Sequence, residues 1–415
     1  MLLIISFHYF FFVLESPAWE REIGMLYYMS DSPGVGGRIK EKPEDFVVEE
    51  VNELGRAQVL LLRGKKAPMD PEGSGDFLWV VMEKRDWATV DAINRLSRIL
   101  KIPTKHIGFA GTKDKKALTA QWISLRGVKW RDLRNIGLRD MAFHTPVYMH
   151  SRLRLGHLQG NYFEIRIRGA RGQIPTVRRF PNYFAHQRFG SYRFVSHIVG
   201  RHILRGEWEE AVRAYLTITS EYEPNRTREA REWLSDNWGD WKGALSLFPK
   251  RLRPEQMILR ALSRGDSYER ALKRLHPRMF SLFIHAYQSY LFNLILSRRL
   301  EHGVRPERGD ILLHGIPTAM IPGYRSKFAG GVQGEIERSV LEEEGVDLSE
   351  FRRFKKYSAD GGRRKILERA EDFSVSRNVV SFYLPKGSYA TALLREIMKV
   401  KEPEGFVFTP GSPSA

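Results

Sequence analysis

One acidic residue stands out among those that could do chemistry. Asp114 lies in the segment IGFAGTKDKKALTAQWISL (residues 107–125), between Lys113 and Lys115. A run of Gly, Thr and Lys around one acid suits a phosphate-binding turn, a catalytic loop that meets a polyanion, or an ordinary exposed loop, where Asp often caps a turn. The loop by itself leaves these three interpretations open, so the rest of the chain has to decide.

The motifs that the sequence lacks narrow the chemistry. It contains no G-x-x-x-x-G-K-[ST] loop, no G-x-G-x-x-G turn, no H-E-x-x-H and no G-x-S-x-G. Without cysteine it has no disulfide, thiolate nucleophile or Cys-ligated zinc, and its 12 His are scattered without the spacing of a metal site. We therefore expect a carboxylate to act without metal or cofactor.

The net charge indicates the class of partner. The 415 residues carry a formal charge of +18, and such an excess of Lys and Arg favours a polyanion because it displaces condensed counterions from phosphates. We expect nucleic acid rather than a membrane, since no segment approaches the roughly 20 apolar residues that span a bilayer. The absence of cysteine fits a cytoplasmic protein, and no obligate protein partner is implied.

Periodicity predicts the elements that would position the Asp114 loop. Strand patterns occur near residues 46–51 and 76–86, an amphipathic helix follows in TVDAINRLSRILKI, and GNYFEIRIRG (160–169) alternates cleanly. From near Pro181 to about residue 355 the patterns are mostly helical, and strand character returns in NVVSFYLPKG before a last helix. We expect a helical insertion within a sheet domain, with the strand at 379–384 returning to the sheet that holds residues 161–168.

The first 24 residues show no targeting signal. MLLIISFHYFFFVLESPAWEREIG lacks a basic start and a small-residue cleavage site. We expect residues 1–24 to be a dispensable extension with the working start at Met25 or Met29, and a membrane anchor is the less favoured alternative.

One reaction needs only a carboxylate in a basic loop and an aromatic side chain on a strand, both of which this sequence contains. Isomerising uridine to pseudouridine breaks the C1′–N1 bond and makes a C1′–C5 bond without an energy source or metal, and a carboxylate can serve as nucleophile or base. The base must be flipped out of its stack and held on an aromatic face.

Six stretches resemble the TruD family of tRNA pseudouridine synthases. They are GRIKEKPEDFVVEE, IGFAGTKDKKALTAQWISL, GNYFEIRIRG, PNYFAHQRFG, HAYQSYLFN and FYLPKGSYATALLRE, in family order from about residue 37 to 400. The resemblance implies an α+β fold in which a catalytic domain with a mixed or antiparallel sheet is interrupted by a mostly helical TRUD domain. On this resemblance we expect the catalytic domain in residues 25–183 and 356–415 and the insertion in residues 184–355. The resemblance also implies uridine 13 of tRNA as substrate.

The same resemblance assigns residues to roles. The family's catalytic aspartate falls on Asp114, with attack on ribose or on the uracil ring left open, and the lysine before P-E-D-F falls on Lys40. Asn161 and Phe163 fall on the family's G-N-x-F motif and are expected to bind substrate. Because they lie beside Asp114, three lysines are expected to contact RNA phosphates, the alternative being an ordinary solvated face: Lys113, Lys115 and Lys116.

Two predictions from this assignment can be tested against a structure. A carboxylate that stays ionised in a cleft closed over a flipped uracil needs a nearby cation, so Lys40 should lie within about 4–6 Å of Asp114; the alternative is a solvated strand lysine. An RNA-binding module or tRNA chaperone without catalytic activity would show the same charge and helical block, but it would not require Asp114 in an intact loop.

Overall fold

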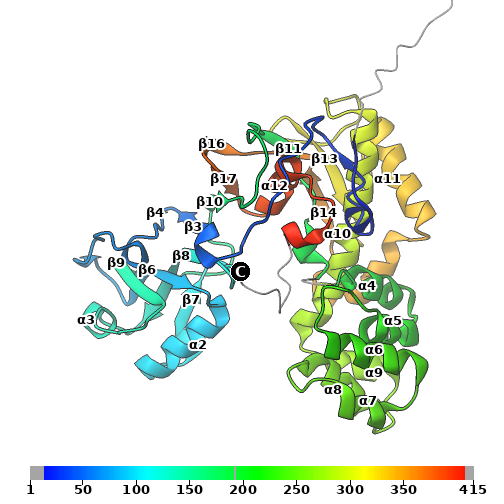
Figure 1. Cartoon of the computed structure of the whole chain (residues 1–415), viewed down its shortest axis with the longest axis horizontal. Helices are drawn as coiled ribbons and strands as arrows, with labels where there is room; N and C mark the ends of the chain where they lie inside the picture. Colours follow the sequence, from blue (N-terminus) through cyan, green and yellow to red (C-terminus); the bar gives the residue numbers. More distant parts are fainter. Residues whose placement is uncertain (1–13, 191–192, 407–415) are drawn as a thin grey trace, which may run out of the picture. The chain divides into compact units, whose positions relative to one another are not determined.

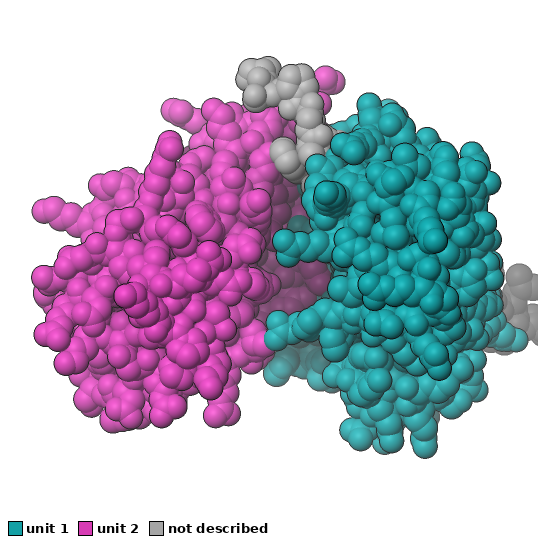
Figure 2. All heavy atoms as spheres, turned by 90° about the horizontal axis from the view of Figure 1, so that it is seen from below, with its two compact units in different colours: residues 1–33, 179–368, 399–415 teal, residues 34–178, 369–398 magenta. Residues whose placement is uncertain are grey.

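The computed structural model describes residues 14–190 and 193–406 and contains both helices and a mixed sheet, as the α+β prediction requires (Figure 1). The chain forms two compact units, which are coloured separately in Figure 2. Unit 1 comprises Met1–Pro33, Arg179–Glu368 and Lys399–Ala415, and unit 2 comprises Gly34–Arg178 and Arg369–Met398.

Unit 2 is built on a ten-stranded sheet in the order β16-β17-β10-β3-β8-β6-β9-β5, with β4 beside β3 and β7 beside β8. β17 is antiparallel to β10, with Phe382 opposite Phe163, so the predicted return of the late strand to this sheet is confirmed. The elements are β3 (Phe46–Asn52), β4 (Gly55–Arg56), β5 (Glu72–Gly73), β6 (Phe77–Arg85), α2 (Thr89–Leu100), β7 (Ile107–Phe109), β8 (Leu118–Arg126), α3 (Trp130–Leu133), β9 (Met141–Met149), β10 (Gly160–Arg166), β16 (Glu371–Ser376), β17 (Val379–Pro385) and α12 (Ala390–Met398).

One parallel pair within this sheet matters for the candidate site. β3 and β8 are parallel neighbours, with Val47 opposite Leu118. The chain therefore enters both strands at the same edge, and the segments that precede them meet there. Lys40 lies in the segment before β3, and Asp114 lies in the loop before β8.

The predicted amphipathic helix, α2, covers one face of the central strands (Figure 1). Its apolar residues pack with alternate residues of β6 in one buried cluster that includes Leu78, Val80, Met82, Ala92, Ile93 and Leu96. The helix ends at Lys101, whose φ of 53° is left-handed, shortly before Pro103, which cannot continue it. Because this packing is dense, α2 is a fixed wall beside the Asp114 loop.

Unit 1 is mostly helical and is centred on α10, which runs from Pro277 to His302. By length and composition alone α10 could cross a membrane, contrary to the expectation that no such segment exists, but 67% of its apolar window is buried inside the protein. Phe283, Ile284 and Leu291 of α10 belong to the main core of the unit, so their burial against neighbouring helices accounts for the apolar run.

The other elements of unit 1 are short. They are β1 (Leu14–Glu15), α1 (Ala18–Arg21), β2 (Tyr27–Tyr28), β11 (Arg179–Pro181), α4 (Ser196–Arg205), α5 (Trp208–Thr217), α6 (Asn225–Asp236), α7 (Trp241–Leu247), α8 (Arg253–Leu262), α9 (Tyr268–Lys273), β12 (Leu312–Leu313), β13 (Ile316–Ile321), α11 (Gly331–Glu343), β14 (Gly362–Lys365) and β15 (Leu367–Arg369).

The compact units divide at other points than the predicted domain boundaries. The chain passes between the units after Pro33, Arg178, Glu368 and Met398, whereas the predicted boundaries of the insertion lie at 183/184 and 355/356. The polar stretch at 355–365 looks like a linker in the sequence, but part of it forms β14, which pairs with β13 from within unit 1. Non-local strand pairing of this kind leaves no local signal in the sequence.

The predicted extension, residues 1–24, is a second point of difference. Trp19 and Ile23 are buried, and two polar side chains of α10 bind this segment: Asn293 Nδ2 donates to the Ile23 carbonyl at 2.9 Å and Ser297 Oγ to the Gly24 carbonyl at 2.8 Å. Residues 1–13 of the extension lie outside the described residues. A dispensable leader does not fit residues 16–24, because their removal would expose apolar surface and take away the hydrogen bonds that Asn293 and Ser297 make to this segment.

Candidate active site

Asp114 and Lys40 form an ion pair at the shared entry to β3 and β8. Lys40 Nζ lies 2.5 Å from Asp114 Oδ2, and the two side chains are 14% and 43% exposed. The predicted proximity of Lys40 to Asp114 is thus confirmed. The carboxylate stays accessible from solvent while its cation is mostly covered, so a substrate can reach the acid without displacing the lysine.

The backbone at Lys40 is strained. Its φ is 59°, in the left-handed region that a residue with a Cβ rarely adopts. The Lys40 ammonium also lies 4.1 Å from the centre of the Phe46 ring, at cation–π distance. Residues held in such conformations cluster at functional sites, where the surrounding structure enforces them. The strain therefore indicates that the position of this side chain matters.

A second lysine, Lys84, binds the backbone of the loop, a role that was not predicted from the sequence. The side chain of Lys84 is fully buried at the end of β6, and its Nζ donates to the Trp87 carbonyl at 2.7 Å and to the Asp114 carbonyl at 3.0 Å. Burial lowers the pKa of Lys84 to about 8, and the negative charge of Asp114 partly offsets this effect. Lys84 thus fixes the backbone of the residue that carries the candidate catalytic carboxylate.

The sequence predicted that Lys113 contacts RNA phosphates, but its side chain is buried against an acidic residue. Its side chain is 5% exposed and its Nζ lies 2.5 Å from Oε2 of Glu50, which is completely buried. Burial raises the pKa of Glu50, and the Lys113 charge opposes that rise. The phosphate-contact prediction for Lys113 does not fit this structure, in which the lysine compensates a buried acid.

A chain of neutral hydrogen bonds completes the support of the loop. The Lys113 amide donates to Thr89 Oγ1 at 2.9 Å, and Thr89 Oγ1 donates to Gln121 Oε1 at 2.9 Å. Gln121 Nε2 donates to the Gly111 carbonyl at 3.0 Å. The Thr on α2 and the Gln on β8 thereby tie both sides of the loop to the sheet, which pre-organises the acid.

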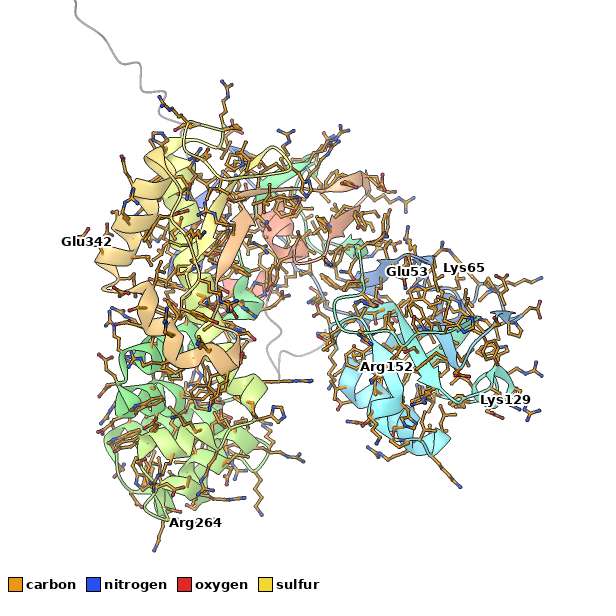
Figure 3. All side chains as sticks on the ribbon, turned by 180° about the vertical axis from the view of Figure 1, so that it is seen from behind. Glu53, Lys65, Lys129, Arg152, Arg264 and Glu342 are labelled. Carbon is orange, nitrogen blue, oxygen red and sulfur yellow. The ribbon has the colours of Figure 1, made fainter. Side chains whose placement is uncertain are left out.

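The other two lysines of the loop remain on its outer side. Lys115 is exposed and Lys116 is partly exposed. Basic residues also occur far from the loop: Lys65 and Lys129 in unit 2 and Arg264 in unit 1 extend outward from the ribbon (Figure 3). Positive surface charge is therefore carried by both units and is not confined to the site.

Asn161 lies on the same face of the sheet as Glu50, which is its register partner in β3. Its Oδ1 is buried and has no hydrogen-bond partner among residues 14–190 and 193–406. An unsatisfied buried acceptor costs free energy, so this atom is suited to a donor supplied by a ligand.

Phe163 is 7% exposed and packs between two other rings. Its centroid lies 5.3 Å from that of Phe382 in a stacked arrangement and 6.2 Å from that of Phe46 in an edge-to-face one. The ring that contacts the Lys40 ammonium is that of Phe46. Phe163 thus supports Phe46 directly, while its expected contact with substrate stays a prediction.

Metal ligation has no evident site in the described part of the chain, where no group of three or more His, Asp or Glu side chains could hold an ion. The described groups that could act on a substrate are the Lys40–Asp114 ion pair, its buried anchors and the unpaired acceptor Asn161 Oδ1.

Known proteins with similar sequences share one description. The sequence matches the family model for tRNA pseudouridine synthase D (TruD) over residues 22–315 and 313–397. It is 41% identical to the probable tRNA pseudouridine synthase D of Methanopyrus kandleri, over 79% of this chain and 86% of that protein. It is 36% identical to the probable tRNA pseudouridine synthase D 1 of Methanocaldococcus jannaschii, over 92% of this chain and 100% of that one.

A solved structure agrees with these sequence matches. The crystal structure of the "Putative tRNA pseudouridine synthase D (TruD)" from Methanosarcina mazei superposes with a TM-score of 0.72 at 32% identity and covers 93% of this chain and 99% of that one. The family match extends over both compact units, including the Asp114 loop and the late strand β17. The chain therefore belongs to the TruD family of tRNA pseudouridine synthases, isomerases that convert uridine to pseudouridine in tRNA.

Proposed function

We propose that this enzyme isomerises uridine 13 of tRNA with Asp114 as the catalytic residue and Lys40 as its charge partner. The observation that carries the assignment of the acid is the Lys40–Asp114 pair on a loop anchored by Lys84 and Gln121. The position in tRNA rests on the family resemblance.

The reaction is balanced without a co-reactant. The C1′–N1 bond breaks, the uracil turns in place, and a C1′–C5 bond forms. The hydrogen on C5 leaves as a proton while N1 gains one, so substrate and product are isomers. Asp114 serves as nucleophile or base towards the ribose or the ring. The Lys40 ammonium keeps the carboxylate ionised when the flipped base excludes water.

The neighbouring groups suit a flipped uracil. The orphan Oδ1 of Asn161 is an acceptor for an N–H of the ring, since uracil offers one at N3. Phe46 is buried and contacts the Lys40 ammonium, so its ring, packed against Phe163, positions the cation of the pair. Lys115 and Lys116 on the outer side of the loop are placed to contact phosphates.

A tritium-release assay tests the proposal. The purified chain is mixed with a tRNA transcript labelled with tritium at uridine C5, in buffer with EDTA and with no other protein. We expect release of one label per tRNA, and a transcript in which uridine 13 is replaced by cytidine should release none. Tight tRNA binding without any release would favour the alternative, an RNA-binding protein without activity. Release that persists from the cytidine 13 transcript would place the target elsewhere.

A further inference from the structure

We propose that a hollow beside the Asp114 loop binds the nucleotide next to the target uridine; the proposal rests on the function proposed above. The hollow has a volume of about 720 Å³ and lies entirely within unit 2. Its lining includes Trp87, Asn94, Arg95, Arg98, Lys115 and Arg139. The volume is in the range of ligand-binding pockets, and the lining does not include Asp114, Lys40 or Asn161.

The hollow and the candidate catalytic acid are held by the same buried group. The ammonium of Lys84 donates to the carbonyl of Trp87, which lines the hollow, and to the carbonyl of Asp114. Lys115, the residue after Asp114, also lines it. A nucleotide bound there therefore has a fixed position relative to the carboxylate, as a neighbour of a flipped base requires.

The cations of the hollow suit a phosphate. Arg95 and Arg98 are three residues apart on α2 and thus lie on the same helical face, while Lys115 and Arg139 come from two other segments. All four are exposed, and within the described residues none of them forms a side-chain ion pair. Guanidinium groups bind phosphate oxygens through paired hydrogen bonds.

The remaining groups suit a nucleobase rather than phosphate alone. Three carboxylates also line the hollow: Asp86, Asp91 and Asp140. A surface that only tracked a polyanion would exclude carboxylates, but the N–H groups of a base edge need acceptors. Trp87 supplies an aromatic ring and Asn94 an amide, the side-chain types that stack on and read unpaired RNA bases. The hollow therefore offers partners for both the base and the phosphate of one nucleotide.

The experiment combines two variants with altered substrates. Trp87→Leu removes the aromatic ring but keeps apolar volume, because Trp87 also packs on the core beside α2. Arg98→Ala removes an exposed cation, so folding is not at stake. Arg126→Ala, an exposed cation at the end of β8 outside the hollow, is the matched control for charge. Substrates are the labelled tRNA and two versions with an abasic residue on either side of the target.

We expect Trp87→Leu to lower kcat/KM by about 5- to 150-fold on intact tRNA, as for the loss of one base–aromatic stack. On one of the two abasic substrates the same variant should cause no further loss. Arg98→Ala should raise KM more than Arg126→Ala does. The thermal unfolding midpoint of each variant is measured to confirm that it is folded.

The possible outcomes separate this proposal from the proposed function. If folded Trp87→Leu and Arg98→Ala match the Arg126→Ala control while the wild type releases tritium, the hollow binds no flanking nucleotide and the proposal is overturned. If the wild type releases no tritium, the proposed function fails. The hollow is then judged by the dissociation constants of the three RNAs, which must differ between wild type and Trp87→Leu for intact tRNA and for one of the two abasic RNAs, but not for the other.

Discussion

Two buried cations, one in each unit, show how similar chemistry serves different ends. Arg299 in α10 of unit 1 is fully buried and makes two hydrogen bonds of 2.8 Å to the carboxylate of Asp310. It also donates to the carbonyls of Gly303 at 2.8 Å and Arg305 at 2.7 Å. The Asp310 carboxylate balances the charge of this guanidinium. The guanidinium in turn joins the end of α10 to the following loop, so its role is structural.

Lys84 in unit 2 is just as deeply buried, but its charge is stabilised by carbonyl groups instead of a carboxylate. It donates to two carbonyl groups, and no carboxylate lies within 4.0 Å of it in the described part of the chain. A buried charge without a close counter-ion is unfavourable, and such exceptions concentrate where function requires them. The difference between Arg299 and Lys84 thus supports the proposal of an active site at Asp114, whose backbone Lys84 binds.

The largest expected effect tests that location directly. Asp114→Asn should lower single-turnover tritium release by about 10³-fold or more, because it removes nucleophile or base character at nearly constant shape. The dissociation constant for tRNA should change by less than about threefold. Asp310→Asn in unit 1 is the control, and its rate should stay close to that of the wild type while the protein is folded. Substantial release from Asp114→Asn would mean that the catalytic residue has been assigned wrongly.

The next effect concerns stability in unit 1. Arg299→Met should destabilise the unit by about 3–5 kcal/mol, because the buried carboxylate of Asp310 is left without its cation. Hydrogen exchange of the α10 amides measures this locally, which is appropriate in a chain of two units. The rate of tritium release per folded molecule should be unchanged. A rate that fell in the folded protein would show that Arg299 is not merely structural.

A smaller effect follows from the titration of Lys84. Its pKa is lowered to about 8 in the folded protein, so between about pH 8 and 10.5 the unfolded chain binds more protons and the free energy of unfolding rises with pH. One pKa unit corresponds to about 1.4 kcal/mol, which gives a rise of roughly 3 kcal/mol over this range and no change with pH below about pH 8, where Lys84 is charged in both states and its burial penalty is constant. Lys84→Met should lack this rise, as measured by hydrogen exchange of the β6 amides. Equal slopes in both proteins would contradict it.

How much of the site could be predicted from sequence depends on the kind of information needed. Strand patterns predicted β6 and β10, the latter by clean alternation, and helical periodicity predicted α2, because these patterns are local. The proximity of Lys40 to Asp114 came from a family resemblance. Its physical cause, the parallel pairing of β3 with β8, joins segments far apart in the chain and has no local signal.

The buried lysines were missed for a related reason. Lys113 looks like part of a solvated cluster, and its burial is explained only by Glu50, which faces it from β3. A signal was present: in VVEEV two adjacent acids interrupt an apolar strand, so one must point to each face, and each needs a cation if both faces are covered. The same argument applies to Glu83 and Lys84 near the end of β6, which is buried along most of its length.

The smallest expected effect separates strain from function at Lys40. Its left-handed backbone, with a φ of 59°, is unfavourable for any residue with a Cβ but not for glycine. Lys40→Met keeps the strain and removes the charge, and Lys40→Gly removes both. Both should slow tritium release by about 10-fold or more while tRNA binding changes little, because the Asp114 carboxylate loses its cation. Since the pair is partly exposed, its own contribution to stability is small.

The two variants should differ only in stability. Lys40→Gly should be about 1 kcal/mol more stable than Lys40→Met, as measured by hydrogen exchange of the β3 amides, because the left-handed conformation no longer brings a Cβ into contact with the backbone. Lys40→Arg is the control that keeps a cation beside Asp114 and should retain more of the rate than either. If Lys40→Gly were fast, the ammonium would be dispensable and the strain would need another cause. If it were slow yet more stable, the protein would be keeping an unfavourable conformation for the sake of one charge next to its catalytic acid.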